Sequence, residues 1–117
     1  MEQRDYRRLC HILDYCNKIE TTVQRYGDNF SLFEEDLDYQ QSISFSILQI
    51  GELSSGLSEE YKSATSDKMP WRAIKDMRNL VVHGYGSVDF SIVWQTVKND
   101  IPALKQFTEE EIEKYSF

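Results

Sequence analysis

The segment "RNLVVHGY", residues 78 to 85, holds three side chains whose types and spacing could act on a phosphate. Arg78 carries a guanidinium, a fixed fork of donors that matches the geometry of phosphate oxygens. His83 follows five residues later, and an imidazole with a pKa near ~6.5 can donate or accept a proton at neutral pH. Tyr85 adds a hydroxyl two residues further on. Groups of these types could together transfer protons and bind an anion.

Each of these three residues also has an interpretation without catalysis. A histidine at the C-terminus of a helix can interact with the helix dipole and nothing more. An arginine can lay its apolar stem along the edge of a core. A tyrosine near a turn can pack and hydrogen-bond one carbonyl. The spacing alone therefore leaves a purely structural role for Arg78, His83 and Tyr85 open.

A helix is expected to position the segment, because Pro70 fits a first helical position and a helical period runs from Trp71 to about His83. Arg78 is an exception on the helical wheel, since it falls inside the apolar arc. Asn79 lies on the polar side, one turn from His83, so the two can touch. The apolar arc consists of Trp71, Ile74, Met77, Leu80, Val81 and Val82, and the polar arc of Arg72, Lys75, Asp76, Asn79 and His83.

A charge on an apolar face must be paired or must face a groove, because an unpaired buried charge is very costly. Glu52 is an equally unexpected charge in the apolar segment "LQIGELS". We therefore expect Arg78 and Glu52 to approach each other, with Gly51 allowing a second backbone to come close. Such a pair predicts that Glu52→Ala destabilises the fold. Arg78 and His83 are about 140° apart on an ideal helix, which favours a cleft completed by a second copy of the chain.

The first half of the chain is expected to form two long helices. Apolar residues at three- and four-residue steps predict a first helix from about residue 3 to 25, which "YGDN" ends. Ser31 and Glu34 in "SLFE" predict a capping box at the start of a second helix. This helix should continue to about Ser55, with Gly56 as its stop.

The second half is also expected to be helical, with a short helix in "SEEYKSAT". Ser87 or Asp89 should cap the last long helix. Pro102 lacks a backbone N–H, so this helix should kink or restart near Asn99 to Ile101. Its inner face should carry Val93, Val97, Ile101 and Leu104. The pattern predicts an all-α, four- to five-helix up-and-down bundle in one domain, residues 1–117.

Composition excludes several classes of protein. The net charge of −7 argues against a dedicated nucleic-acid binder, so any RNA contact should be local, transient or made by an assembly of chains. No apolar run approaches the ~18 residues of a membrane span, and the N-terminus lacks a signal-peptide core, so we expect a cytoplasmic protein. Cys10 and Cys16 are expected to be buried, reduced thiols. His11 and His83 have no nearby partners at ligand spacing, so no metal site is predicted.

Over nearly its whole length the chain resembles HEPN-domain proteins of the HepT type. "RNLVVHGY" resembles their Arg-x4-His-x-Tyr signature. The order of the other parts is also similar: "QIGELS" late in the second helix, then "MPWRAIKDMRNLVVHGYGSVD", then "VW" and "IPAL" in the last helix.

The resemblance implies an all-α HEPN-like fold and a homodimer in which the motifs of both chains meet in an interface cleft. It implies a metal-independent endoribonuclease without a cofactor, acting as the toxin of a type II or type VII toxin–antitoxin system. Arg78 and His83 would be the catalytic pair, supported by Asn79. The implied partners are an RNA substrate and a minimal nucleotidyltransferase (MNT) antitoxin that silences the toxin by transferring AMP to Tyr85. Glu52 is a supporting residue that comes from the helical wheel and not from the motif.

Two other functions fit parts of the sequence. A non-catalytic HEPN module could bind and hold the nucleotidyltransferase, which agrees with the net charge of −7. A plain dimeric helical bundle could use residues 78 to 85 only for capping and pairing. The complete set of Arg78, His83 and Tyr85 argues against the first, and the placement of Arg78 argues against the second.

Overall fold

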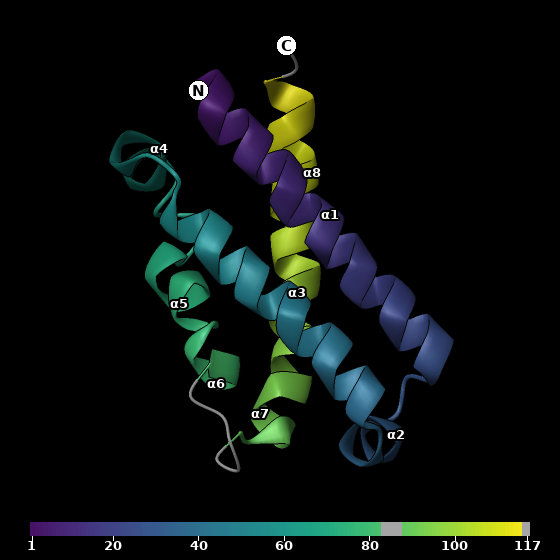
Figure 1. Cartoon of the computed structure of the whole chain (residues 1–117). Coiled ribbons are helices and arrows are strands. Elements are labelled where there is room, and N and C mark those ends of the chain that lie inside the picture. The colour runs from purple at the N-terminus through teal and green to yellow at the C-terminus, as the bar shows by residue number, and fades with distance from the viewer. Residues whose placement is uncertain (83–87, 116–117) are drawn as a thin grey trace.

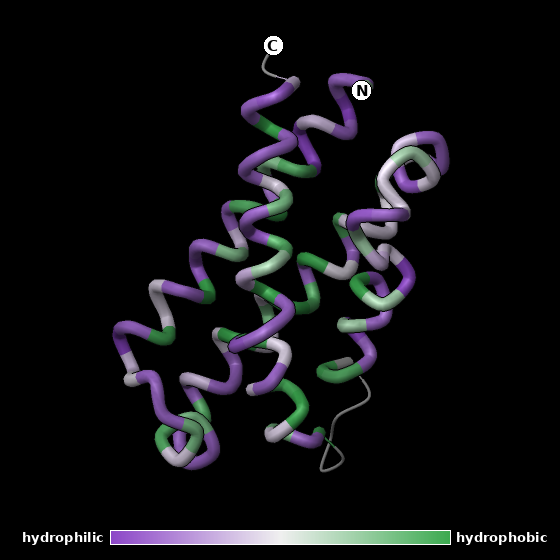
Figure 2. Tube along the Cα trace, turned by 180° about the vertical axis from the view of Figure 1, so that it is seen from behind, coloured by the Kyte–Doolittle hydropathy of each residue, from purple (hydrophilic) through white to green (hydrophobic). Residues whose placement is uncertain are grey.

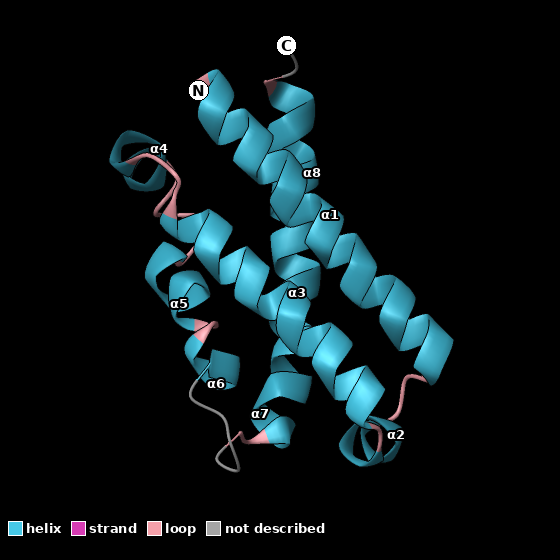
Figure 3. Cartoon of the chain, viewed as in Figure 1, coloured by secondary structure: helices cyan, strands magenta, loops and turns pink. Residues whose placement is uncertain are grey.

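The computed structural model describes residues 1–82 and 88–115. Within these ranges the chain forms helices and short connections and no strand, which confirms the predicted all-α class (Figures 1 and 3). The elements are α1 (Gln3–Tyr26), α2 (Phe30–Glu35), α3 (Leu37–Ser55), α4 (Glu59–Ala64), α5 (Trp71–Asp76), α6 (Asn79–Val82), α7 (Phe90–Gln95), the π-helical turn η1 (Thr96–Asp100) and α8 (Ile101–Lys114). No helix in these ranges is both long and apolar enough to cross a bilayer.

The long elements alternate in direction. Figure 1 shows α1 and α3 running antiparallel across the front, with α5 and α6 beside α3 and the continuous α7–η1–α8 rod behind. The start of α1 and the end of α8 lie at the same end of the molecule (Figure 1). This is the up-and-down order that the sequence predicts, and it places the turn between α5 and α6 against α3.

The core lies between α1, α3 and the α7–η1–α8 rod, and Figure 2 shows apolar residues on the sides of the helices that face one another. The predicted inner face of the last helix is confirmed, because its four residues are buried: Val93, Val97, Ile101 and Leu104. Both cysteines are free, and Cys16 is buried as expected, whereas Cys10 is only half-buried. Burial raises the pKa of the Cys16 thiol from 9.0 to about 12.

The predicted start of the second helix is wrong in two respects. Asn29, and not Ser31, caps α2, because the Asn29 side chain accepts a hydrogen bond from the Ser31 N–H at 2.8 Å. Asp36 then interrupts the predicted long helix and caps α3 through the N–H of Tyr39 at 3.2 Å. The side-chain amide of Gln40 donates to two carbonyls at the end of α2, so the break leaves them satisfied.

The restart expected near Pro102 is present and takes the form of a π-helical turn followed by a new α-helix. The turn Thr96–Asp100 is π-helical, and the N–H of Ile101 donates to the carbonyl of Thr96, five residues earlier. A new α-helix begins at Ile101 with Pro102 in its first turn, where the missing N–H costs least. Asp89, one of the two predicted caps, caps α7, and Ser87 lies outside the described residues. A hydrogen bond from the Ser91 hydroxyl helps to hold the pKa of Asp89 below its usual value.

A chain of hydrogen bonds ties α1, α4 and α8 together at the end of the bundle that holds both termini. Asp5 is buried in α1 and accepts from the backbone N–H and hydroxyl of Ser58, at 2.8 and 2.6 Å. Ser58 caps α4 by accepting from the N–H of Tyr61 at 3.1 Å. The Tyr61 hydroxyl then donates to the buried carboxyl of Glu111 in α8 at 2.7 Å. Burial and this bond raise the pKa of Tyr61.

Removing the donor from this chain should destabilise the fold. Tyr61→Phe leaves the Glu111 carboxyl buried without its partner, so we expect the free energy of unfolding to fall by about 1–3 kcal/mol, measured by urea denaturation. The double variant Tyr61→Phe/Glu111→Leu removes both polar groups and should be closer to wild type than the single variant. Equal stability of Tyr61→Phe and wild type would contradict this role for the bond.

Candidate active site

Arg78 lies at the turn between α5 and α6, on the side that faces α3. The apolar arc of the helical wheel is confirmed up to this turn, because Trp71, Ile74 and Met77 are buried. The predicted helix from Trp71 to about His83 is wrong in one respect, since it is divided at residues 77 and 78. Here the N–H of Leu80 donates to a carbonyl only three residues earlier, at 3.0 Å, so the turn is tighter than an α-helix. The angle of about 140° expected between Arg78 and His83 assumed an unbroken helix, so it no longer applies.

Gly51 allows this turn to lie directly against α3. A Cβ atom at position 51 would come within 3.0 Å of the Arg78 Cβ, 3.2 Å of the Lys75 carbonyl oxygen and 3.4 Å of the Arg78 backbone nitrogen. Any side chain larger than hydrogen would therefore push against the backbone that carries Arg78. The close approach expected at Gly51 is confirmed, and it places Arg78 over the next residue of α3, Glu52.

Arg78 and Glu52 form an ion pair in which the Arg78 Nη1 donates to the Glu52 Oε1, as expected. Both side chains are about half exposed, at 41% and 50%. Half-exposed pairs contribute about 0–1 kcal/mol, because solvent screens them. The destabilisation expected from Glu52→Ala is therefore small. Glu52 occupies the Nη1 donor of the guanidinium. The other N–H groups of Arg78 remain able to donate to an anion that approaches from the solvent.

The remaining predicted site residues are only partly placed by the structure. Asn79 is the first residue of α6 and is exposed, so its amide can reach solvent beside Arg78. His83 and Tyr85 lie outside the described residues, and their roles stay predictions. The structure thus brings Arg78, Glu52 and Asn79 to one edge of α3.

Comparison with known proteins assigns the chain to a family. A sequence profile described as "Ribonuclease HepT-like" matches residues 12–111. The chain belongs to the HepT-like ribonuclease family. The matched range contains the whole "RNLVVHGY" segment and Glu52, so the resemblance found in the sequence is confirmed.

Curated relatives agree with the HepT-like assignment. A protein of Caldanaerobacter subterraneus subsp. tengcongensis, named provisionally as an RNase, is 32% identical over 91% of this chain and 92% of its own length. A protein of Thermococcus cleftensis, named provisionally as ribonuclease HepT, is 35% identical over 61% of this chain and 67% of its own length. A further provisional RNase, from Methanocaldococcus jannaschii, is 27% identical over 66% of this chain and 78% of its own. No solved structure matches the chain significantly.

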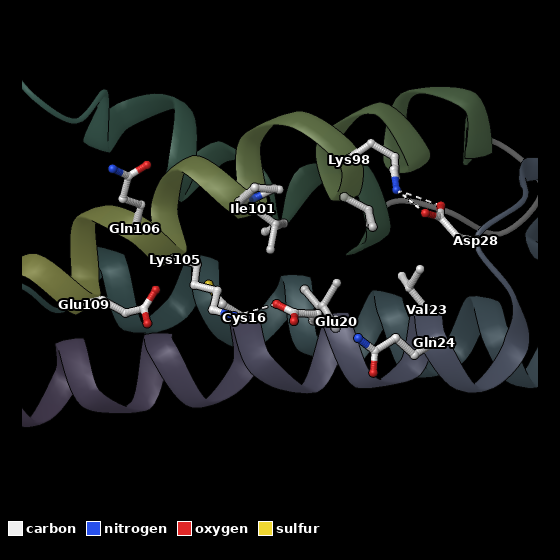
Figure 4. A pocket seen from close by; sticks show the side chains of 13 residues that line it. Cys16, Glu20, Val23, Gln24, Asp28, Lys98, Ile101, Lys105, Gln106 and Glu109 are labelled. Carbon is white, nitrogen blue, oxygen red and sulfur yellow. Dashed lines mark hydrogen bonds and ion pairs between the residues drawn. The ribbon is translucent and has the colours of Figure 1, made fainter.

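A groove elsewhere in this HepT-like chain contains none of the three predicted site residues that the structure describes, Arg78, Glu52 and Asn79. It has a volume of about 360 Å³ and lies between α1 and the η1–α8 rod, with Cys16, Ile19 and Ile101 in its lining. Two ion pairs bridge it, Lys98 with Asp28 and Lys105 with Glu20 (Figure 4). Because no described residue of the "RNLVVHGY" segment lines this groove, the candidate active site is the Arg78–Glu52 edge of α3.

The contact at Gly51 gives a direct test of the HepT-like site geometry. Gly51→Val adds a branched side chain where even a Cβ has only 3.0–3.4 Å, so we expect Arg78 to be displaced and RNA cleavage to fall by about a hundredfold. The measurement is the cleavage rate of a labelled RNA together with the melting temperature. Ser55→Val, on the same helix at a half-buried position, is the control. A folded Gly51→Val variant with the wild-type rate would contradict the proposed contact.

Proposed function

We propose that this chain is a cytoplasmic, metal-independent endoribonuclease toxin that cleaves RNA with Arg78 and His83. Membership of the HepT-like ribonuclease family supports the reaction class. The half-exposed guanidinium of Arg78 is the observation that carries the assignment of the site, because a fixed, accessible fork beside "NLVVHGY" suits the oxygens of a phosphodiester.

The reaction needs only groups that the chain supplies. The 2′-hydroxyl of RNA gives its proton to one imidazole, and its oxygen attacks the adjacent phosphorus. A new O2′–P bond forms and the P–O5′ bond breaks. A second imidazole, which is protonated, acts as the acid and gives a proton to the leaving O5′. Arg78 stabilises the extra negative charge on the phosphoryl oxygens, which is worth roughly 3–4 kcal/mol in the transition state.

A homodimer would supply both proton-transfer groups. Each chain carries a single histidine in the motif, His83, whereas the reaction uses one base and one acid. Two copies whose motifs meet in one cleft would provide two imidazoles and two guanidinium groups. We therefore propose that the active form is a homodimer, with Asn79 of each copy at the edge of the cleft.

An MNT-type nucleotidyltransferase is the proposed antitoxin. Transfer of AMP to the Tyr85 hydroxyl would place a phosphodiester and an adenosine in the motif, seven residues from Arg78. The new anion would compete with RNA for the guanidinium, and the adenosine would occupy the cleft. This modification would explain how a toxin can be silenced without being unfolded.

The rival function is a non-catalytic binding partner of the nucleotidyltransferase. Two observations favour it: the net charge of −7, which disfavours RNA, and the Glu52 carboxylate, which already pairs with Arg78. Expression separates the two functions. A ribonuclease toxin should arrest growth and degrade RNA in the wild type and do neither as His83→Ala, whereas a binding module should leave growth and RNA intact in both.

The modification predicts a separable effect at Tyr85. Tyr85→Phe keeps the aromatic ring and removes the acceptor oxygen, so this variant should remain toxic while escaping neutralisation by the co-expressed antitoxin. Mass spectrometry should show one added AMP on the wild type and none on Tyr85→Phe. Tyr15→Phe removes a hydroxyl at a half-buried position of α1 and serves as the control that still accepts AMP. Full AMP transfer to Tyr85→Phe would identify another acceptor.

A further inference from the structure

A pocket with a basic rim lies where the C-terminal end of α3 meets α4 and α5, which lie side by side in Figure 1. It has a volume of about 640 Å³. We call it the basic pocket and define it by six of its lining residues: Ser54, Lys62, Ser63, Ser66, Arg72 and Lys75. Three of these are cations and three are hydroxyls, a set that suits an anion with several oxygens.

The positive charge of the basic pocket is largely uncompensated. Glu59 is the carboxylate in its lining, and it pairs with Lys62 at 3.1 Å. Arg72 and Lys75 are exposed, and no ion pair within the described ranges engages either of them. In a chain with a net charge of −7, two free cations on one wall make a local site for an anion.

Ser54 supplies an independent observation. Ser54 is one of the residues that line the basic pocket, it is 1% exposed, and within the described residues its Oγ is buried without a hydrogen-bond partner. An unsatisfied buried hydroxyl costs about 1–3 kcal/mol. A ligand oxygen in the basic pocket could accept the bond that the fold leaves unmade.

The basic pocket and the candidate active site lie next to each other along α5. Arg72, Lys75 and Arg78 follow one another at three-residue steps. Arg72 and Lys75 lie on one side of α5, and Arg78 lies in the turn between α5 and α6. Each step advances about 4.5 Å along a helix. The Lys75 carbonyl and the Arg78 backbone both lie against Gly51. A row of cations therefore leads from the Arg78–Glu52 pair to the pocket.

We propose that the basic pocket binds the phosphodiester backbone of the RNA strand next to the phosphate that is cleaved at Arg78. This inference rests on the proposed ribonuclease function. The contact is to backbone and not to bases, because the aromatic residue in the lining, Trp71, offers no free face. Trp71 is 6% exposed, packs on Tyr61 and Phe107, and donates to Thr65 at 2.8 Å. Phosphate contacts of this kind hold a strand without reading its sequence.

The test measures binding of an RNA that cannot be cleaved. The probe is a fluorescein-labelled, 2′-O-methyl RNA oligonucleotide, and its affinity is followed by fluorescence anisotropy over a range of salt concentrations. The double variant Arg72→Gln/Lys75→Gln should bind about tenfold more weakly, and its log–log salt dependence should be shallower by roughly 1.4, about 0.7 for each lost phosphate contact. The control Lys18→Gln/Arg25→Gln changes the net charge equally on exposed positions of α1 and should keep the wild-type slope.

Ser54→Ala gives a readout that a structural role would not produce. Removing an unsatisfied hydroxyl should leave the melting temperature unchanged or raise it, whereas RNA binding should weaken. Stable Ser54→Ala protein with undiminished binding would count against the basic pocket, as would equal losses for the two double variants.

The outcomes also separate this inference from the proposed function. Wild-type protein that binds the probe through Arg72 and Lys75 but cleaves no unmodified RNA would support the basic pocket and refute the ribonuclease. Wild-type protein that cleaves RNA while both double variants bind alike would refute only the basic pocket. A wild type that does not bind the probe at all would overturn the basic pocket directly, and its cleavage of unmodified RNA would then decide the ribonuclease on its own.

Discussion

His83→Ala is expected to lower the rate of RNA cleavage by about 10²–10⁴-fold, because the reaction loses the group that moves its protons. The single-turnover rate on a labelled RNA at neutral pH is the measurement. If the imidazoles of two copies serve as base and acid, the wild-type rate should follow a bell-shaped pH profile. The variant should lose that shape along with its rate.

His11→Ala is the matched control for this prediction. His11 is the other histidine of the chain, and it is exposed on α1. His11→Ala should cleave at the wild-type rate and melt at the wild-type temperature. A His83→Ala protein that is folded and fully active would remove His83 from the reaction, and with it the proposed mechanism.

Arg78→Gln is expected to lower cleavage by about 10²–10³-fold, the usual loss when one donor to a developing oxyanion is removed. The effect on stability should be small, because the pair with Glu52 is half exposed and contributes about 0–1 kcal/mol. Single-turnover kinetics and urea denaturation on the same preparations separate the two effects. If the free energy of unfolding fell by as much as the activation free energy of cleavage rose, Arg78 would have a structural role.

Glu52→Ala tests how Glu52 contributes to RNA cleavage. The carboxylate fixes the direction of the Arg78 guanidinium, so its removal should slow cleavage by about tenfold, less than Arg78→Gln. The double variant Glu52→Ala/Arg78→Gln should be no slower than Arg78→Gln alone, because Glu52 acts through Arg78. Additive losses in the double variant would contradict this positioning role.

The helices could largely be predicted from the sequence, because the local signals for them are strong. The period of apolar residues gave α1 to within a residue or two, and Asp89 and Pro102 marked the start of α7 and the restart at α8. The predicted helix boundaries are wrong where several residues could cap or interrupt the same helix. Asn29 and Ser31 are both good caps, and Asp36 interrupts a run whose period continues on either side. A local pattern does not decide between such alternatives.

The candidate site was predictable in part for a physical reason. Arg78 and Glu52 each lie on an otherwise apolar helix face in the sequence pattern. Opposite charges in such positions are expected to pair, because an unpaired charge there is costly, and the structure has them paired. The basic pocket was not predictable, because Ser54, Lys62 and Arg72 come from three different helices whose packing the sequence pattern does not define. The break between α5 and α6 was missed because Met77 and Arg78, the residues at the break, give no local signal such as a glycine or a proline.

The most direct test of the central claim is a cleavage assay with purified protein. Wild type and His83→Ala are incubated with end-labelled RNA in excess EDTA, and the ends of the fragments are analysed. The proposed mechanism predicts fragments with 2′,3′-cyclic phosphate ends from the wild type alone. Intact RNA with the wild type, or equal cleavage by His83→Ala, would contradict a ribonuclease that works through Arg78 and His83.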